Sequence, residues 1–218
     1  MEILYEDNHL LAINKPAGWL VQGDHTGDQT LTDWGKAYLK EKYNKPGAVF
    51  LHPVHRIDRP VSGIVLFART DKALTRLMET FRTREVRKSY CAWVLHTPEP
   101  AQATLTHWLS KNESKNYVTA YPKPHGDAKE SILEYKVKDS QGGITLLHIF
   151  PLTGRSHQIR TQLAFIGCPI VGDLKYGALS PLPDASIALH AMRLELMHPV
   201  KKEMILIEAA TPGISPWI

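Results

Sequence analysis

The chain has 218 residues, of which 43% are hydrophobic and 22% charged, as in an ordinary globular protein long enough to bury a sizeable core in one domain or one and a half. Its two cysteines are too few for a disulfide framework, and no signal peptide or apolar run of transmembrane length is visible. The net charge of +4 is modest. These features exclude secreted disulfide-rich and membrane-spanning classes, so we expect a soluble, cytoplasmic protein with no membrane contact.

The N-terminal part of the sequence predicts two strands and a helix. Apolar residues at 3–5 and 10–13 flank the turn residues Asp7 and Asn8, which is typical of two paired strands. Residues 30–33 (TLTD) form a capping-box pattern, and apolar residues follow it at helical spacing. We therefore expect a helix that begins just after Thr30.

The middle of the chain predicts a buried strand, a second helix and a series of further strands. Residues 64–68 (IVLFA) are an unbroken apolar run. Four apolar residues recur at helical spacing and are expected in the core, namely Leu74, Leu77, Met78 and Phe81. Further strands are expected at residues 87–95, 103–110, 116–121, 130–138, 144–151, 187–196 and 203–209.

A third helix is predicted near residue 157. Ser156 is a suitable N-cap, the apolar residues Ile159, Leu163 and Ile166 follow at helical spacing, and Gly167 ends the pattern. Because helices do not alternate strictly with strands along the chain, a doubly wound parallel sheet is disfavoured. The pattern favours a mixed α and β fold.

One carboxylate stands out in the segment HRIDRPVSG at residues 55–63, where Asp58 lies between Arg56 and Arg59. Flanking cations favour the ionised form of a carboxyl group. An aspartate held charged at the end of a buried strand can serve as a nucleophile or an electrostatic catalyst. The structural alternative is a turn in which Asp58 caps its own backbone, because Pro, Asp, Ser and Gly are common turn residues.

A second candidate lies in the segment TGRSHQIR at residues 153–160. Arg155 stands where the third helix is expected to begin, and a cation there gains nothing from the helix dipole, which favours anions. This position favours a role of Arg155 toward a partner over a role in the helix itself. It precedes Ile159 by about one turn, so both side chains are expected on the same side.

Charge is unevenly distributed along the sequence. Residues 1–33 carry six acidic residues and one lysine, a balance of −5, whereas residues 69–90 carry seven basic and three acidic residues, a balance of +4. The second segment includes Arg82, Arg84 and Arg87. A polyanionic partner such as RNA is the functional interpretation, and a solvated helix face is the alternative.

Two hydrolase alternatives rest on the same region. His52, His55 and Asp58 have a spacing seen in metal sites, but no cysteine or histidine pair completes a closed set of ligands, and Pro53 disrupts a helical arrangement. Ser62 near a histidine could suggest a serine hydrolase, but no G-x-S-x-G elbow surrounds it. We therefore expect no metal site.

The two motifs resemble those of the RluA-type RNA pseudouridine synthases. That family has H-R-L-D-x-x-T-S-G and T-G-R-x-H-Q-(I/L)-R, where this chain has HRIDRPVSG and TGRSHQIR. One departure is Val61, where the family usually has Thr or Ala. The resemblance covers roughly residues 3–212 and includes supporting matches at residues 14–18 (NKPAG), 87–90 (RKSY), 169–173 (PIVGD), 189–191 (LHA) and 198–199 (HP).

The resemblance implies an α+β fold, with a single catalytic domain over residues 1–218, a mixed and mainly antiparallel sheet, flanking helices and a central cleft. Many family members carry a small N-terminal RNA-binding domain. Here the catalytic pattern begins at residue 3, so we expect that domain to be absent. A non-catalytic RNA-binding protein on the same fold is the strongest alternative, because fold alone does not fix activity.

The implied chemistry is the conversion of a uridine in structured RNA to pseudouridine after the base leaves its stack. The resemblance makes Asp58 the catalytic carboxylate, which attacks either the sugar or the base. It pairs Arg155 with Asp58 and stacks Tyr90 on the uracil, with its phenol available for the proton on carbon 5. Ile159 would pack beside the ring. No cofactor is implied, because the reaction is an isomerisation.

The remaining site residues are implied to contact RNA or to support the site. Arg56 would enter the RNA where the base departed, or else form a salt bridge with Asp58. Arg59, Lys15 and Lys88 are expected near the substrate, the two lysines as structural support or phosphate contacts. The expected partner is transfer RNA, large-subunit ribosomal RNA or both, with no obligate protein partner.

Overall fold

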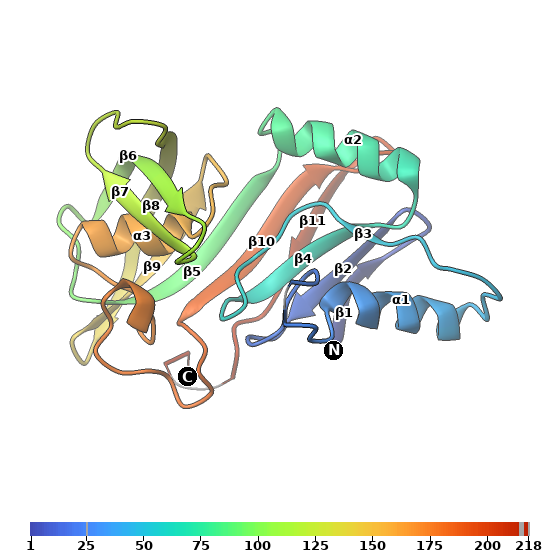
Figure 1. Ribbon diagram of the computed structural model, residues 1–218, viewed down its shortest axis with the longest axis horizontal. Helices are drawn as coiled ribbons and strands as arrows, with labels where there is room; N and C mark the ends of the chain where they lie inside the picture. The colour runs from blue at the N-terminus through green and yellow to red at the C-terminus, as the bar shows by residue number, and fades with distance from the viewer. Residues whose placement is uncertain (25, 214–215, 218) are drawn as a thin grey trace. The chain divides into compact units, whose positions relative to one another are not determined.

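The helices and strands of the computed structural model fall into two units, which are described separately (Figure 1). Residues 1–24, 26–213 and 216–217 are described. Unit 1 comprises residues 1–87 and 191–212, and unit 2 comprises residues 88–190 with the described residues from 213 onward. The unit boundaries fall at the start of one strand, β5, and near the start of another, β10.

Unit 1 contains a sheet in which the strands lie in the order β1-β2-β4-β10, with β11 beside β10 and β3 beside β4. The ladders β1–β2, β2–β4, β3–β4 and β10–β11 are antiparallel. The elements are β1 (Glu2–Glu6), β2 (Leu10–Lys15), α1 (Leu31–Lys42), β3 (His52–Pro53), β4 (Ser62–Ala68), α2 (Asp71–Arg82), β10 (Leu189–Met197) and β11 (Met204–Glu208).

Strand β4 is buried along its whole length because helices cover both faces of the sheet around it. Ala73 and Leu77 of α2 belong to the same buried cluster as Leu10 and Ala12 of β2. Gly35 of α1 instead lies against Leu11 and Ile13, the alternate residues of β2. Alternate side chains of a strand point to opposite faces, so α1 and α2 pack on opposite sides. This explains the unbroken apolar run at residues 64–68.

The first helix of unit 1, α1, begins where the sequence predicts. Thr30 caps α1 in a capping box, since its hydroxyl accepts the Asp33 N–H and the Asp33 carboxylate accepts the Thr30 N–H. The prediction for α2 was wrong at Met78, which is 51% exposed. Met78 lies about 100° around the helix from the buried Leu77, at the edge of the apolar face. Its side chain therefore lies at the surface and not in the core.

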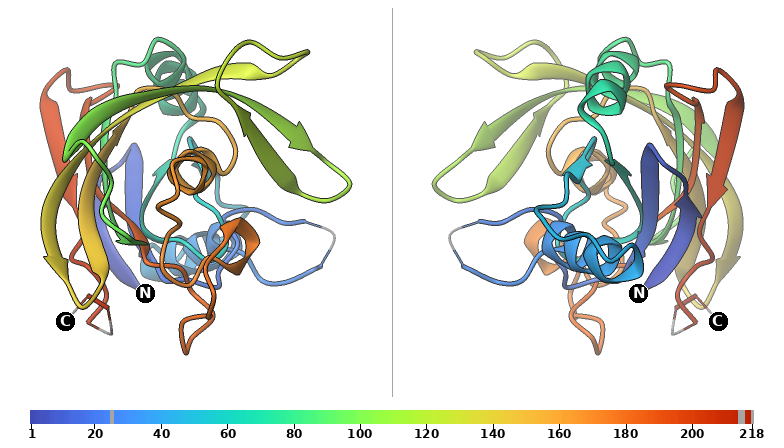
Figure 2. Two further views of the ribbon diagram at one scale, coloured as in Figure 1. Left: turned by 90° about the vertical axis from the view of Figure 1, so that its left-hand side faces the viewer. Right: turned by 90° about the vertical axis from the view of Figure 1, so that its right-hand side faces the viewer.

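Unit 2 contains a sheet in the order β5-β9-β8-β6-β7, in which every ladder is antiparallel. Figure 2 shows these strands curving around α3, which packs against β6 and β7. Burial alternates along β8 and β9, as expected for strands with one covered face. The elements are β5 (Arg87–Leu95), β6 (Gln102–Asn112), β7 (Tyr117–Tyr121), β8 (Lys129–Gln141), β9 (Ile144–Pro151), α3 (Gln158–Phe165) and η1 (Leu174–Tyr176).

The start of α3 differs from the prediction. The residue at its N-cap is His157, not Ser156, and His157 makes no side-chain capping hydrogen bond. Arg155 consequently lies in the loop before the helix and not one helical turn from Ile159. The backbone of His157 adopts a left-handed conformation with φ of 49°, so the helix starts only after this residue. The predicted stop at Gly167, where φ is 77°, is confirmed.

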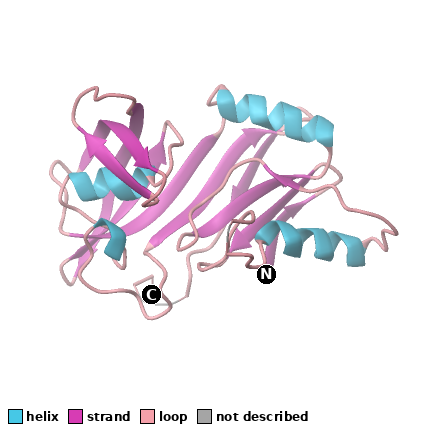
Figure 3. Ribbon diagram, viewed as in Figure 1, coloured by secondary structure: helices cyan, strands magenta, loops and turns pink. Residues whose placement is uncertain are grey.

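The fold class predicted from the sequence is confirmed. The fold is α+β, with a mixed, mainly antiparallel sheet and flanking helices. The strand β3 and the short helix η1 were not predicted. Figure 3 shows that the chain between the regular elements consists of loops, which include the two motif segments leading into β4 and α3. No helix in the described parts of the chain combines the length and apolar character needed to cross a membrane.

Gly63 is required by the close approach of β4 to β10. Its φ is 112°, and a Cβ at this position would lie 2.3 Å from the carbonyl oxygen of Ala191. We expect Gly63→Ala to lower the free energy of unfolding by about 3 kcal/mol or more, because ~1–2 kcal/mol of backbone strain adds to ~1–3 kcal/mol of overpacking. Urea unfolding measures this change.

Gly177 supplies the matched control. Its φ is 106°, but an added Cβ would meet only Pro169, at 3.8 Å. Gly177→Ala should therefore cost only about 1–2 kcal/mol, from backbone strain alone. Equal losses for the two variants would contradict the steric explanation.

Candidate active site

Asp58 occupies a tight turn at the start of β4 in unit 1. The Val61 N–H donates to the Asp58 carbonyl oxygen at 3.0 Å, which closes the turn. Ile57 and Val61 are buried on either side, whereas Asp58 itself is half-buried. The two apolar anchors fix the backbone and leave the carboxylate partly accessible. The departure from the family pattern at Val61 therefore places an apolar side chain in the core.

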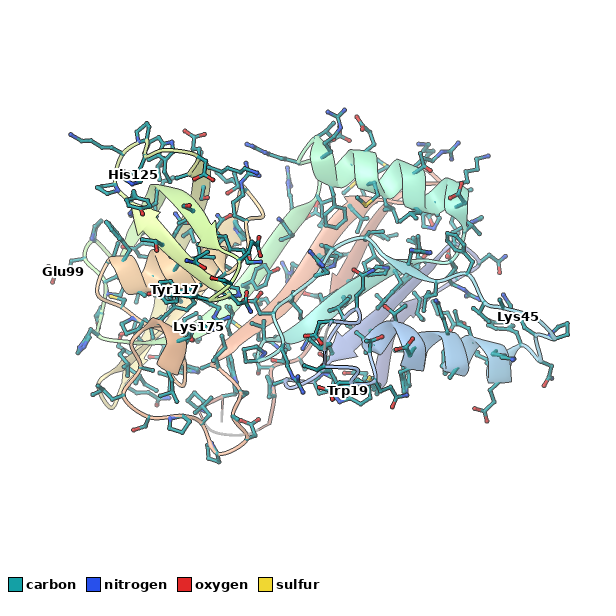
Figure 4. The ribbon with its side chains drawn as sticks, viewed as in Figure 1. Trp19, Lys45, Glu99, Tyr117, His125 and Lys175 are labelled. Carbon is teal, nitrogen blue, oxygen red and sulfur yellow. The ribbon has the colours of Figure 1, made fainter. Side chains whose placement is uncertain are left out.

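A buried lysine lies behind this turn. The Lys15 side chain is fully buried, and its ammonium donates to the carbonyl oxygens of Pro16 at 3.1 Å, Trp19 at 2.9 Å and Arg59 at 3.1 Å. Trp19 is labelled in Figure 4. An ammonium group has three N–H donors, and these three carbonyls match them. This environment favours the structural role considered for Lys15 over a phosphate contact.

Asp58 and Lys15 interact electrostatically. Burial lowers the pKa of Lys15 from 10.5 to about 7, the negative charge of Asp58 acts in the opposite direction, and the charge of Arg59 lowers the pKa further. Removing an ammonium from water disfavours its charged form, and a nearby carboxylate restores part of that loss. The charge of Asp58 therefore favours the protonated form of Lys15, and Lys15 in turn binds the backbone of the aspartate turn at Arg59.

The other residues of the aspartate motif lie at the surface or against the core of unit 1. Arg56 is exposed. Arg59 is exposed as well, and its guanidinium contacts the Gly18 carbonyl oxygen and the Asp28 carboxylate. The His55 ring accepts the Leu66 N–H through Nε2, which occupies the lone pair that a metal would need. Among the described residues, no group of three or more His, Cys, Asp or Glu side chains could hold a metal ion.

The arginine motif forms a loop in unit 2 that Gln158 holds together. The Gln158 side-chain oxygen accepts hydrogen bonds from the Thr153 hydroxyl at 2.8 Å and the Arg155 N–H at 2.9 Å, and its amide donates to the Ile132 carbonyl oxygen at 3.1 Å. Gln158 is buried. The loop is thus fixed by one side chain while Arg155 remains exposed, with its Nε 3.4 Å from the Glu130 carbonyl oxygen.

A second polar cluster supports the same loop from below α3. The His157 Nδ1 lies 2.7 Å from the Tyr176 hydroxyl, which also accepts the Val118 N–H. Arg160 binds Asp173 through two hydrogen bonds of 2.7 and 2.9 Å, and both side chains are buried. A paired and hydrogen-bonded arrangement of this kind is what buried charges require. The cluster holds the left-handed backbone of His157 in place.

The sequence reasoning missed Gln158 and Tyr176 as supports of the arginine loop. Gln158 is part of the motif itself, so its position next to Arg155 was an available signal. Tyr176 lies outside the two motifs, in the short helix η1, so no sequence pattern pointed to it. Two neighbours of Tyr176 are labelled in Figure 4. The Tyr117 ring stacks on the Tyr176 ring with 5.0 Å between ring centroids, and the Lys175 ammonium donates to the Asn116 carbonyl oxygen.

The remaining predicted site residues of unit 2 are Lys88, which lies over the arginine loop, Tyr90 of β5 and Ile159 of α3. A Cβ added to Gly154 would lie 3.6 Å from the Lys88 Nζ, so the Lys88 ammonium lies over the arginine loop. Tyr90 is half-buried in β5, opposite Ile149 of β9. Ile159 is buried in the first turn of α3. Unit 2 therefore groups Lys88 with the loop that carries Arg155.

The basic segment ends α2 and leads into β5. Arg82 forms an exposed ion pair with Glu79, and Arg87 forms one with Glu195. Arg84 is exposed and has a left-handed backbone with φ of 63°. All three guanidinium groups lie at the surface of unit 1.

Comparison with known proteins decides the family. The model for RNA pseudouridylate synthases matches residues 9–165, a range that contains both motifs. The chain belongs to this family. It is 34% identical over 217 residues to ribosomal large subunit pseudouridine synthase C of Buchnera aphidicola, covering 95% of this chain and 66% of that protein.

Other members of the family show the same extent of similarity. The chain is 34% identical over 220 residues to ribosomal large subunit pseudouridine synthase C of Escherichia coli K12, covering 95% of this chain and 65% of that protein. It is 32% identical over 232 residues to synthase D of Xanthomonas campestris, covering 97% and 66%. The chain thus spans about two thirds of the length of these relatives.

A solved structure supports the same fold. The structure titled human RNA pseudouridylate synthase domain containing 4 matches with a TM-score of 0.80 and 27% sequence identity, covering 97% of this chain and 88% of that one. The family membership expected from the two motifs is therefore confirmed by sequence and by fold.

The burial of Lys15 gives the unfolding free energy a defined pH dependence. Its pKa in the folded state, about 7, lies below the ordinary 10.5, so the unfolded chain binds more protons between these values. The stability that Lys15 contributes is then fully present at high pH and is lost as the pH falls toward 7. The advantage of the wild type over Lys15→Met should grow between pH 7 and 9.5, by up to about 1.4 kcal/mol per pH unit.

Urea unfolding of both proteins at several pH values in this range measures the difference. Comparing the two proteins cancels the titration of all groups that they share. A difference that stays constant with pH would contradict the effect of burial on Lys15.

Proposed function

We propose that the protein converts a uridine in RNA to pseudouridine, with Asp58 as the catalytic carboxylate. The observation that carries this proposal is the family match across residues 9–165, which includes the aspartate turn and the arginine loop. The buried anchors Ile57 and Val61 support it, because they hold a half-buried carboxylate in a fixed turn. Fixed placement of a reacting group is a large part of enzymatic rate enhancement.

The reaction breaks the glycosidic bond to N1 of the uracil and forms a carbon–carbon bond from C5 to the same sugar carbon. The proton on C5 leaves and N1 acquires one, so no oxidant, reductant or group donor is needed. We propose that Asp58 attacks the sugar or the base and that Arg155 pairs with it. Tyr90 would stack on the uracil, and its phenol would accept the C5 proton.

The other site residues are assigned supporting roles in this proposal. Ile159 would pack beside the ring, and Arg56, which is exposed, would enter the RNA where the base has left its stack. Extracting a base costs a few kcal/mol, which favours loops and weakly paired sites. Lys88 would contact a phosphate near the arginine loop, and Lys15 would support the aspartate turn from behind.

We propose large-subunit ribosomal RNA as the first substrate to test, because the named relatives are ribosomal large subunit pseudouridine synthases. Transfer RNA is the second candidate. Mapping pseudouridines in total RNA from cells with and without the gene distinguishes the two. A site lost from 23S-type RNA supports the first candidate, and a site lost from transfer RNA supports the second.

Asp58→Asn tests the catalytic carboxylate. The substitution keeps the shape of the side chain but removes the anion, so pseudouridine formation should fall below detection while folding and RNA binding persist. The matched control is Asp71→Asn, which removes an exposed carboxylate from the first turn of α2 and should leave activity unchanged. Measurable turnover by Asp58→Asn on its cognate RNA would refute the assignment.

Arg82, Arg84 and Arg87 are proposed to contact RNA phosphates. Arg84 is exposed, and the exposed ion pairs of Arg82 with Glu79 and of Arg87 with Glu195 are weak, so phosphates can replace these glutamates. Replacing all three arginines with Gln should lower the salt slope of log affinity by about two units, since each phosphate contact contributes roughly 0.7–0.9. The rate at saturating RNA should change little.

Titration of RNA at several salt concentrations measures this slope. A triple variant of Lys36, Lys40 and Lys45 on and after α1 removes the same charge from another surface of unit 1. If the salt slope of log affinity were the same for the arginine variant, the lysine variant and the wild type, the phosphate contacts of the three arginines would be excluded.

A further inference from the structure

The side chain of Arg59 joins the aspartate turn to a loop that precedes α1. Its Nε donates to the Gly18 carbonyl oxygen at 2.9 Å, and its Nη2 lies 2.8 Å from the Asp28 carboxylate. Asp28 lies in an exposed stretch of this loop and has no role among the motif residues. One guanidinium therefore links two points of the loop, ten residues apart in sequence, to the residue that follows Asp58.

The backbone of Arg59 is bound to the same loop. Its carbonyl oxygen accepts the Gly18 N–H at 2.8 Å and the Lys15 ammonium at 3.1 Å. Gly18 and Arg59 thus exchange two hydrogen bonds, one through the backbone and one through the side chain. The residue next to Asp58 is consequently fixed through its carbonyl oxygen by Lys15 and Gly18 and through its guanidinium by Gly18 and Asp28.

We propose that Arg59 and Asp28 are positioning residues for Asp58 and that Arg59 is not an RNA ligand. This inference rests on the proposed function, because it takes Asp58 as the catalytic carboxylate. The guanidinium is already engaged on two sides, and the Asp28 carboxylate neutralises its charge. Arg82 and Arg87 pair with surface glutamates, whereas Arg59 is held by a backbone carbonyl oxygen as well as by a carboxylate. A phosphate would have to displace both partners of Arg59.

The exposure of the pair predicts which property it controls. The side chains of Arg59 and Asp28 are each 48% exposed, and an ion pair of this kind contributes little to the stability of a fold. A small displacement of a reacting group can nevertheless lower a rate strongly. Loss of the pair should therefore affect the chemical step and leave folding and RNA affinity nearly unchanged.

Single-turnover kinetics and RNA binding test the proposal with Asp28→Asn, Arg59→Gln and the double variant. Each single variant should lower the rate at saturating RNA about three- to tenfold, with the dissociation constant changed less than twofold. The double variant should be no slower than the worse single variant, because both substitutions break one interaction. Arg59→Lys should be intermediate, since lysine keeps the charge but lacks the planar guanidinium whose separate nitrogens contact the Gly18 carbonyl oxygen and the Asp28 carboxylate.

Arg193 and Glu208 provide the matched control. They form an ion pair of similar exposure, 48% and 56%, between β10 and β11 of the same unit. Arg193→Gln and Glu208→Gln should leave both the rate and the affinity unchanged. A loss of rate in these control variants equal to that in Asp28→Asn would overturn the proposal, because the effect would then be general to exposed pairs.

The competing assignment of Arg59 as an RNA ligand predicts a different pattern. Arg59→Gln would then weaken RNA affinity and lower its salt slope by about 0.7–0.9, whereas Asp28→Asn would strengthen binding or leave it unchanged. Either that pattern or an unchanged rate in both single variants would overturn the positioning role.

The contacts of Arg59 with Gly18 and Asp28 form a clasp on the aspartate turn. Amide hydrogen exchange tests this clasp without reference to activity. The Gly18 N–H is bound to the Arg59 carbonyl oxygen and the Val61 N–H to the Asp58 carbonyl oxygen. Both amides should exchange severalfold faster in Asp28→Asn than in the wild type, but not in Glu208→Gln. Unchanged exchange would refute the clasp. If Asp58→Asn stayed active while exchange still accelerated, the function would be wrong and the clasp would stand.

Discussion

The hydrogen bonds of the buried Lys15 ammonium are the constraint on which the candidate site depends. Three carbonyl oxygens surround this group, and one of them belongs to Arg59, next to Asp58. A buried cation without such partners would be strongly destabilising. The loop after β2 therefore folds against the aspartate turn in a way that gives the lysine three hydrogen-bond acceptors. The same contact places the Lys15 side chain against the turn that carries the half-buried Asp58.

In unit 2, the arginine loop is held by the side-chain amide of Gln158 instead of by a buried lysine. The arginine loop joins β9 to α3, and its backbone N–H groups need hydrogen-bond partners outside a regular ladder. The Ile132 carbonyl oxygen of β8 accepts the Leu152 and Thr153 N–H groups. Gln158 accepts the Arg155 N–H from the first position of the helix. His157 takes the left-handed conformation at the N-cap, and Tyr176 holds its ring. Arg155 is thereby left exposed on a loop fixed by hydrogen bonds.

Much of the fold follows from local patterns. The capping box at Thr30, the apolar run of β4 and the alternation in β8 and β9 each reflect one physical rule applied over a few residues. The errors occur where tertiary packing overrides such rules. Met78 has helical spacing but lies beyond the covered face, and Ser156 is a good cap that the left-handed backbone of His157 displaces.

The sequence by itself determined the family and the groups for which we propose reactive roles, because Asp58 and Arg155 lie in motifs defined by residue type and order. Only the tertiary structure decided what supports them. The contacts of Lys15 with Arg59, of Asp28 with Arg59 and of His157 with Tyr176 join residues 19 to 44 positions apart. Such pairs form when a buried polar group meets the nearest available partner, and that partner is set by how the chain packs, not by local sequence.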